Sequence, residues 1–173
     1  MPWYGSHRYL NEFIIENKCK RILEVGVYNG DNAVSMVKAA LRIAEPGMIV
    51  YYGFDFFNYY SKDRVADKLE GLGCDYSLFE GDTTDTLPEV VSSLADMDIV
   101  FIDAGKAYKV VSSDWQSVSR LMHMDTGVFF HNVDYTGVGR VVDEISRNEY
   151  GVEVFHEPGE GKIAVVKKKQ SSV

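Results

Sequence analysis

The sequence predicts a three-layer α/β/α sandwich built on a mostly parallel sheet. Strand-like runs recur with room for a helix between them, and most of these runs are apolar on both faces, as expected for parallel strands that are covered on both sides. Near its end, the chain instead predicts two strands joined by a turn rich in proline and glycine. Five strand–helix repeats followed by a hairpin favour one α/β domain with right-handed crossovers.

Each element follows from a local pattern. The predicted strands cover residues 21–26, 48–55, 75–82, 98–104 and 127–133, and the predicted helices cover about 31–44, 61–72, 84–95, 107–122 and 138–149. In the first of these helices apolar residues recur at helical spacing, and "EPG" at 45–47 ends it. The stretch "GVEVFHEPGEGKIAVVKKK" (151–169) predicts the hairpin. A short helix over 7–17 precedes the first strand, and a flexible tail from about residue 168 completes a single domain over 1–173.

Composition narrows the classes of function. The net charge of −8 argues against broad nucleic-acid binding, which depends on neutralising phosphates. Two cysteines are too few for a disulfide framework and favour a cytoplasmic protein. No apolar stretch approaches the roughly 20 residues that span a bilayer, and the first residues lack the pattern of a signal peptide. We therefore expect neither a nucleic-acid partner nor a membrane partner.

Polar groups stand where the predicted strands end. Ligands of open α/β sheets bind beyond the carboxyl ends of the strands. The residues at these ends are Glu24 and Gly26, Asp55, Gly81 and Asp82, Asp103, and His131 with Asn132. One acidic residue can be a helix cap, and this alternative applies to Asp82. A polar group at all five ends predicts a ligand site.

The first turn, "EVGVYNGDNA" (24–33), indicates the kind of ligand. Gly26 and Gly30 allow the backbone to approach a ligand closely. A dinucleotide would bring its pyrophosphate to the start of the next helix, where Asp31 would repel it; we expect Asp31 to be the N-cap of that helix. This disfavours a nucleotide-dependent oxidoreductase. S-adenosylmethionine carries adenosine without phosphate, and the carboxylate of Asp55 can accept both ribose hydroxyls.

The stretches "LEVGVYNGDNA", "GFDFF", "FEGDTTDTLP", "DIVFIDAGKAY" and "GVFFHNVDYTGV" together resemble the motifs of class I S-adenosylmethionine-dependent methyltransferases. Within this class the chain resembles the small-molecule O-methyltransferases related to the caffeoyl-CoA and catechol enzymes, and the "methyltransferase 24" family. The likeness spans about residues 20–145. It implies a Rossmann-like fold with a seven-stranded sheet in the order 3-2-1-4-5-7-6, ending in an antiparallel hairpin.

The resemblance implies S-adenosylmethionine as cofactor and a set of residues that bind it. It places Asn32 at the methionine carboxylate, Asp55 at the ribose, and Asp82 with Thr83 beside the adenine. Phe56 is expected to pack on the adenosine. The full cofactor-binding set is Glu24, Gly26, Gly30, Asn32, Asp55, Phe56, Gly81, Asp82, Thr83 and Asp103.

The resemblance also implies a divalent metal. In metal-dependent members, an Asp after strand four and an Asp-Asn pair after strand five bind the ion, and these positions are Asp103, His131 and Asn132 here. Lys106 matches the lysine that serves those enzymes as general base. Imidazole suits Zn²⁺, Fe²⁺ or Ni²⁺ better than Mg²⁺. His131 therefore has three open interpretations: it holds a metal, it moves a proton, or it marks a lost metal site.

Two neighbouring positions bear on this choice. Gly105 replaces the second Asp of the family's "DADK" motif, and Asp134 offers a replacement carboxylate. Relatives in the "methyltransferase 24" family often have a His at the strand-five position, with a Tyr and an Asp after strand four that Tyr108 and Asp114 match. The His is therefore compatible with an active enzyme.

We predict a methyltransferase that methylates a hydroxyl of a small acceptor, with Lys106, His131 and Asp103 as catalytic residues. The alternative from another class is a non-catalytic module that binds S-adenosylmethionine and has a degenerate metal site; His131 and Gly105 favour it. The N-terminal segment is short, so a second subunit is expected to complete the pocket rim in a homodimer.

Overall fold

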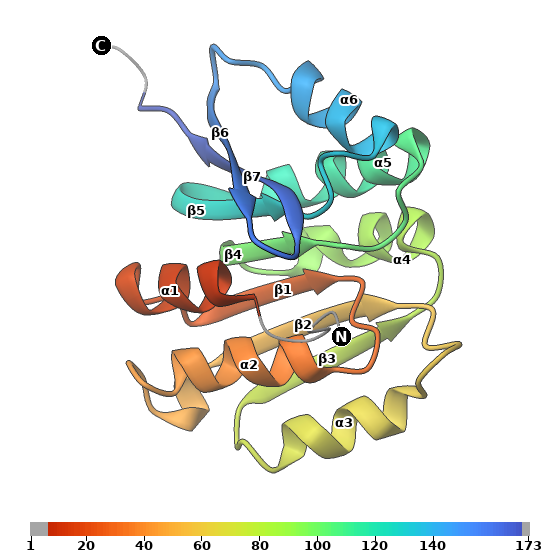
Figure 1. Cartoon of the computed structure of the whole chain (residues 1–173). Helices are drawn as coiled ribbons and strands as arrows, with labels where there is room; N and C mark the ends of the chain where they lie inside the picture. The colour runs from red at the N-terminus through yellow and green to blue at the C-terminus, as the bar shows by residue number, and fades with distance from the viewer. Residues whose placement is uncertain (1–6, 171–173) are drawn as a thin grey trace.

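Seven strands form one sheet in the order β3-β2-β1-β4-β5-β7-β6 (Figure 1). The computed structural model describes residues 7–170. Strands β1 to β5 run parallel to one another, whereas β7 is antiparallel to both β5 and β6. The strands are β1 (Arg21–Val25), β2 (Val50–Asp55), β3 (Asp75–Glu80), β4 (Met97–Ile102), β5 (Met122–Phe130), β6 (Tyr150–Glu157) and β7 (Gly161–Lys168). The order and the hairpin predicted from the sequence are confirmed.

Helices cover both faces of the sheet (Figure 1). One layer contains α1 (Arg8–Glu16), α2 (Asp31–Ala40) and α3 (Lys62–Glu70), and the other contains α4 (Thr83–Val90), α5 (Tyr108–Val118) and α6 (Thr136–Glu144). The central strand β4 shows why its sequence is apolar throughout. Ile99 and Phe101 pack into the layer of α1 to α3, while Val100 and Ile102 pack into the layer of α4 to α6.

The largest difference from the predicted elements is at β5, which begins at Met122 rather than at residue 127. Residues 123–125 are His, Met and Asp, so the first part of the strand lacks an apolar run. The strand ends at Phe130 rather than at 133. Asn132 has a φ of 58°, a left-handed conformation that asparagine adopts more readily than most residues, and it turns the chain out of the sheet.

Helix α1, near the start of the chain, packs against strands β5 and β6, which come late in it. Tyr9 packs against Phe129 of β5 and Phe155 of β6, and Phe13 packs edge-on against Phe129. Gly127 makes this packing feasible, because a Cβ at that position would lie 2.6 Å from the ring of Phe13. The predicted tail begins where β7 ends, and its last residues, 171–173, lie outside the described part of the chain.

Candidate active site

The carboxyl ends of the parallel strands bring the predicted site residues to one edge of the sheet. Asp55 is the last residue of β2, and Asp103 and His131 directly follow β4 and β5. The order reverses between β1 and β4, since β2 follows β1 on one side and β4 pairs with it on the other. Ligands of open α/β sheets bind in the crevice at such a point.

A tight glycine loop connects β1 to α2 at this point. Gly26 has a φ of 94°, and a Cβ there would lie 2.7 Å from the main chain of Asp103 and Ala104. Gly30 has a φ of 80° and lies against Val65 of α3. Both positions therefore require glycine, because both have a positive φ. Gly26 also requires it because it lies against the main chain just after β4.

Asp55 fastens this loop. Its Oδ2 accepts hydrogen bonds from the backbone N–H groups of Val27 and Tyr28, at 2.7 and 2.9 Å, and its Oδ1 accepts one from Phe57 at 2.9 Å. Each carboxylate oxygen offers two lone pairs, so Oδ1 keeps capacity for a further donor. The ring of Phe56, the next residue, is 54% exposed and is available to a ligand.

Glu24 lies beneath the loop, fully buried. Its carboxyl group accepts hydrogen bonds from the hydroxyl of Tyr51 and from the side-chain amide of Asn32, the latter at 2.7 Å. Burial raises the pKa of Glu24 to about 8, against the opposing effect of these two hydrogen bonds. The carboxyl group ties β1, β2 and α2 together through these two hydrogen bonds. Asn32 is itself buried, and its predicted contact with the methionine carboxylate stays a prediction.

Asp31 differs from its prediction. Gly30 is the N-cap of α2 and Asp31 is its first residue, and the backbone N–H of Asp31 donates a hydrogen bond to the Oδ1 of Asn29 at 3.0 Å. The carboxylate of Asp31 is instead 2.6 Å from the Nζ of Lys68 on α3. Its negative charge still lies at the positive end of the helix dipole, where it is favourable.

The third strand leads into a different kind of helix start. Asp82 is the N-cap of α4, and it accepts hydrogen bonds from the backbone N–H of Thr84 at 3.0 Å and from its hydroxyl at 2.8 Å. Asp82 therefore acts as a cap, the alternative considered for it; its role beside the adenine, like that of Gly81, stays a prediction. Behind it, burial raises the pKa of Asp114 to about 7, and neither of its carboxylate oxygens has a hydrogen-bond partner among the described residues.

Asp103 joins the three residues predicted to be catalytic. Its Oδ1 is paired with the ammonium group of Lys106 and lies 2.9 Å from the Nδ1 of His131. Burial alone would raise the pKa of Asp103, but the hydrogen bond from His131 and the charge of Lys106 outweigh it and hold that pKa below its usual range. The carboxylate thus stays charged and orients both neighbours.

The donor set implied by the resemblance is a poor fit for a hard cation such as Mg²⁺. Of Asp103, His131 and Asn132, one offers an imidazole, and the ammonium group of Lys106 already occupies the Oδ1 of Asp103. Asp134 accepts a hydrogen bond from the backbone N–H of Lys162 at 2.8 Å, so it fastens the β6–β7 hairpin. A metal bound by the predicted set stays a prediction.

Two residues beside this cluster were missed by sequence reasoning. His7, just before α1, lies with its Nδ1 2.6 Å from the Oε2 of Glu160 in the turn between β6 and β7. The ring of His7 is centred 5.0 Å from the ring of His131. Both residues lie outside the stretch that resembles known motifs, and no local pattern marks either of them.

A model of a family described as a methyltransferase domain, "methyltransferase 24", matches residues 23–133, which is more than half of the chain. The chain belongs to this methyltransferase family. Both the family and the sheet order are those of class I S-adenosylmethionine-dependent methyltransferases. The predicted enzyme class, a methyltransferase, is thereby confirmed.

Solved structures share the fold of this methyltransferase at low sequence identity. An O-methyltransferase from Bacillus cereus in complex with SAH has 15% identity and a TM-score of 0.78, over 97% of this chain and 84% of that one. TomG from Streptomyces achromogenes, an O-methyltransferase of tomaymycin synthesis in complex with SAM, has 18% identity and a TM-score of 0.76, over 94% and 78%. CalS11, a TDP-rhamnose 3'-O-methyltransferase of calicheamicin biosynthesis, has 18% identity and a TM-score of 0.71, over 92% of this chain and 75% of that one. No protein with a curated description matches the chain.

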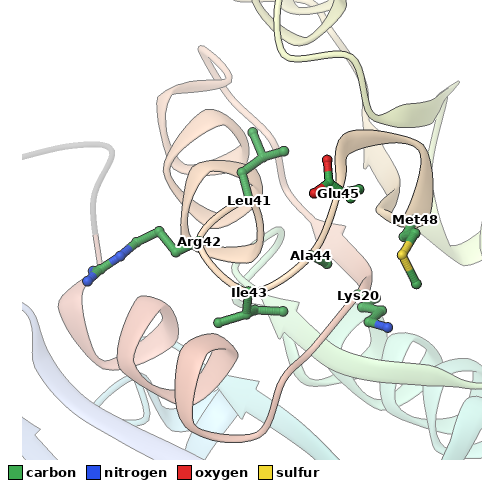
Figure 2. Close-up of a pocket in the computed structure, with 7 residues that line it drawn as sticks. All are labelled: Lys20, Leu41, Arg42, Ile43, Ala44, Glu45 and Met48. Atoms are coloured by element: carbon green, nitrogen blue, oxygen red, sulfur yellow. The ribbon is translucent and has the colours of Figure 1, made fainter.

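A hollow of about 420 Å³ lies at the other edge of the methyltransferase sheet, where the strands begin (Figure 2). It lies between Lys20, which precedes β1, and the loop from Leu41 to Met48 that leads into β2. The side chain of Arg42 extends away from Lys20 and Met48 (Figure 2). The hollow is thus remote from the carboxyl ends of the strands.

None of the helices within residues 7–170 combines the length and apolar character that a membrane crossing needs.

Proposed function

We propose that this methyltransferase transfers the methyl group of S-adenosylmethionine to a hydroxyl group of a small acceptor. The observation that carries the proposal is the position of Asp103, which holds Lys106 and His131 together beside the glycine loop. The structures that share the fold and are described as O-methyltransferases, one of them acting on TDP-rhamnose, support oxygen as the methylated atom.

In this reaction a C–O bond forms as the C–S bond of the sulfonium breaks, and the acceptor hydroxyl loses its proton. S-adenosylmethionine supplies the electrophilic methyl group. The chain's own contribution is mainly alignment, and such positioning can lower a barrier by about 7–11 kcal/mol. Asp55 and the glycine loop would hold the adenosine end, while Asp103 and its neighbours lie where the acceptor enters.

Lys106 is the proposed proton acceptor, as the resemblance implies. Asp103 positions its amine at the edge of the sheet through their ion pair, and the amine becomes a base after it releases its own proton to solvent. A phenol, with a reference pKa of about 10, gives up its proton more readily than an aliphatic hydroxyl. The ring of Tyr135, 56% exposed just after β5, offers a flat surface for an aromatic acceptor. Both points favour phenolic acceptors.

The test follows transfer of a labelled methyl group from S-adenosylmethionine to a panel of phenols, catechols and sugars. Wild-type protein is expected to methylate phenols. Lys106→Ala should bind S-adenosylmethionine as tightly as wild type but turn over roughly 100-fold more slowly, the lower end of the usual contribution of a general base. Lys109→Ala, a substitution of an exposed lysine on the adjacent helix, is the matched control and should keep full turnover.

Two outcomes would contradict the proposal. Tight cofactor binding without turnover on any acceptor would favour a non-catalytic module, and methylation of sugars alone would overturn the phenolic preference.

A homodimer and a cytoplasmic location are further parts of the proposal that rest on sequence composition and length. Light scattering on the purified chain tests the dimer directly.

A further inference from the structure

Three residues from distant parts of the chain meet at one end of the sheet. His7 precedes α1, His131 follows β5, and Glu160 lies in the turn between β6 and β7. Each offers one ligand atom, and these atoms all lie within 4.8 Å of one another. Among residues 7–170, these three form the one group of His, Cys, Asp or Glu side chains close enough together to hold a metal ion. In Figure 1 the turn between β6 and β7 lies close to the start of α1.

The imidazole of His131 is oriented as in a metal site. Its Nδ1 lies 2.9 Å from the carboxylate of Asp103, while its Nε2 is buried and has no hydrogen-bond partner among the described residues. Histidines that bind metals almost always donate their second ring N–H to a carboxylate, carbonyl or water. A buried ring nitrogen without any partner carries a desolvation cost, and a bound ion would remove it.

His7 and Glu160 supply the remaining donors. The contact between them, at 2.6 Å, would by itself explain a clamp between the N-terminal segment and the hairpin. The contact between His7 and Glu160 does not give the buried Nε2 of His131 a partner, although the ring of His131 is centred only 5.0 Å from that of His7. The side chains of His7, His131 and Glu160 are 10%, 14% and 22% exposed, so all three are largely withdrawn from bulk water.

We propose that His7, His131 and Glu160 bind one divalent ion of the zinc type. Two imidazoles and one carboxylate suit Zn²⁺ and similar transition metals rather than Mg²⁺. Ligand atoms about 2.1 Å from an ion lie roughly 3.0–3.4 Å apart, so side-chain rotations within the 4.8 Å group would complete the site. Three protein ligands leave a coordination position for water or another oxygen.

This site differs from the one that the resemblance implies. The two share only His131, and Asp103 changes from a ligand into the group that orients a ligand. Lys106 can then keep its ion pair with Asp103 while the metal is bound. The proposal depends on neither the acceptor nor the cofactor, so its test is separate from the test of methyl transfer.

The experiment measures binding of Zn²⁺, Co²⁺ and Mg²⁺ to the tag-free full chain, without S-adenosylmethionine or acceptor. Isothermal titration against a competing chelator gives the Zn²⁺ affinity, and the visible spectrum of bound Co²⁺ reports its ligands. Wild type should bind one Zn²⁺ or Co²⁺ per chain, and millimolar Mg²⁺ should not compete. Both cysteines are buried, so the Co²⁺ spectrum should lack a thiolate charge-transfer band.

Glu160→Gln and His7→Asn should each weaken Zn²⁺ binding at least tenfold and abolish the rise in melting temperature that the metal causes. His156→Asn, which changes an exposed histidine on the same hairpin, is the matched control and should bind as wild type does. The melting temperature without metal shows that each variant is folded. Absence of stoichiometric binding by wild type would overturn the proposal. So would unchanged binding by both variants together with its loss in Asn132→Ala, which would place the ion at the Asp103 cluster.

Discussion

Gly137 lies directly against the main chain of Lys106: a Cβ on Gly137 would lie 2.2 Å from the carbonyl oxygen of Lys106 and 2.6 Å from the backbone nitrogen of Tyr108. The first turn of α6 therefore packs on the loop that carries the proposed base. Two segments that are separate in the sequence thus share one backbone contact, and only glycine leaves room for it.

We expect Gly137→Ala to push the Lys106 loop out of position. Overpacking of this kind costs about 1–3 kcal/mol, because the obstructing atoms belong to the backbone. Urea unfolding should show this loss, and turnover should fall while cofactor affinity is kept. Gly47→Ala is the control, since no atom lies within 4 Å of its added Cβ. Equal stability of the two variants would show that α6 moves aside freely.

Asp114 should make stability depend on pH. Its pKa is raised to about 7 in the folded protein, so between about pH 4 and pH 7 the folded state binds more protons than the unfolded state. The free energy of unfolding should therefore fall as the pH rises through this window. The stabilising contribution is complete at low pH and is lost above about pH 7.

Asp114→Asn should remove this part of the pH dependence. Between pH 5 and the folded-state pKa of about 7 lie two pH units, which correspond to about 2.7 kcal/mol. From pH 5 to pH 8 the free energy of unfolding of wild type, measured with urea, should therefore fall by roughly 2–3 kcal/mol more than that of the variant. Parallel curves for wild type and Asp114→Asn would contradict the buried position of this carboxyl group.

Tyr51 and Glu24 should be energetically coupled. Tyr51→Phe removes the hydroxyl that hydrogen-bonds to the buried carboxyl group and should lower the free energy of unfolding by about 1–2 kcal/mol. Combined with Glu24→Gln, it should give a coupling energy of at least 0.5 kcal/mol in a double-mutant cycle. Tyr52→Phe, on the neighbouring residue of β2, should cost less than about 0.5 kcal/mol. Strict additivity would mean that the two groups act independently.

Asp55→Ala should weaken S-adenosylmethionine binding at least tenfold, or about 1.4 kcal/mol, in isothermal titration. The substitution removes the proposed ribose acceptor and also frees the N–H groups of Val27 and Tyr28. Asp63→Ala removes an equal charge from an exposed position at the start of α3 and should leave the affinity unchanged. An unaltered affinity for Asp55→Ala would exclude this residue from the cofactor site.

The sequence predicted the parts of this structure that leave a local pattern. The buried parallel strands are apolar on both faces, so their order of appearance and their polar ends could be recognised. The start of β5 could not, because residues 123–125 carry no apolar run; in this part of the strand only Met122 pairs with β4, and the register shifts before Gly127. His7 and Glu160 are 153 positions apart, and nothing in the residues around either one indicates that they meet.

The packing of α1 bears on how the chain reaches its native state during synthesis. Helix α1 can meet α2 early, but the aromatic partners of Tyr9 and Phe13 lie on β5 and β6. The ribosome makes those strands more than one hundred residues later. Bringing such distant segments together costs loop entropy that only a formed sheet can offset. Helix α1 therefore completes its packing only after β5 and β6 have been made, and the side that carries Tyr9 and Phe13 stays uncovered until then, when chains are prone to aggregate.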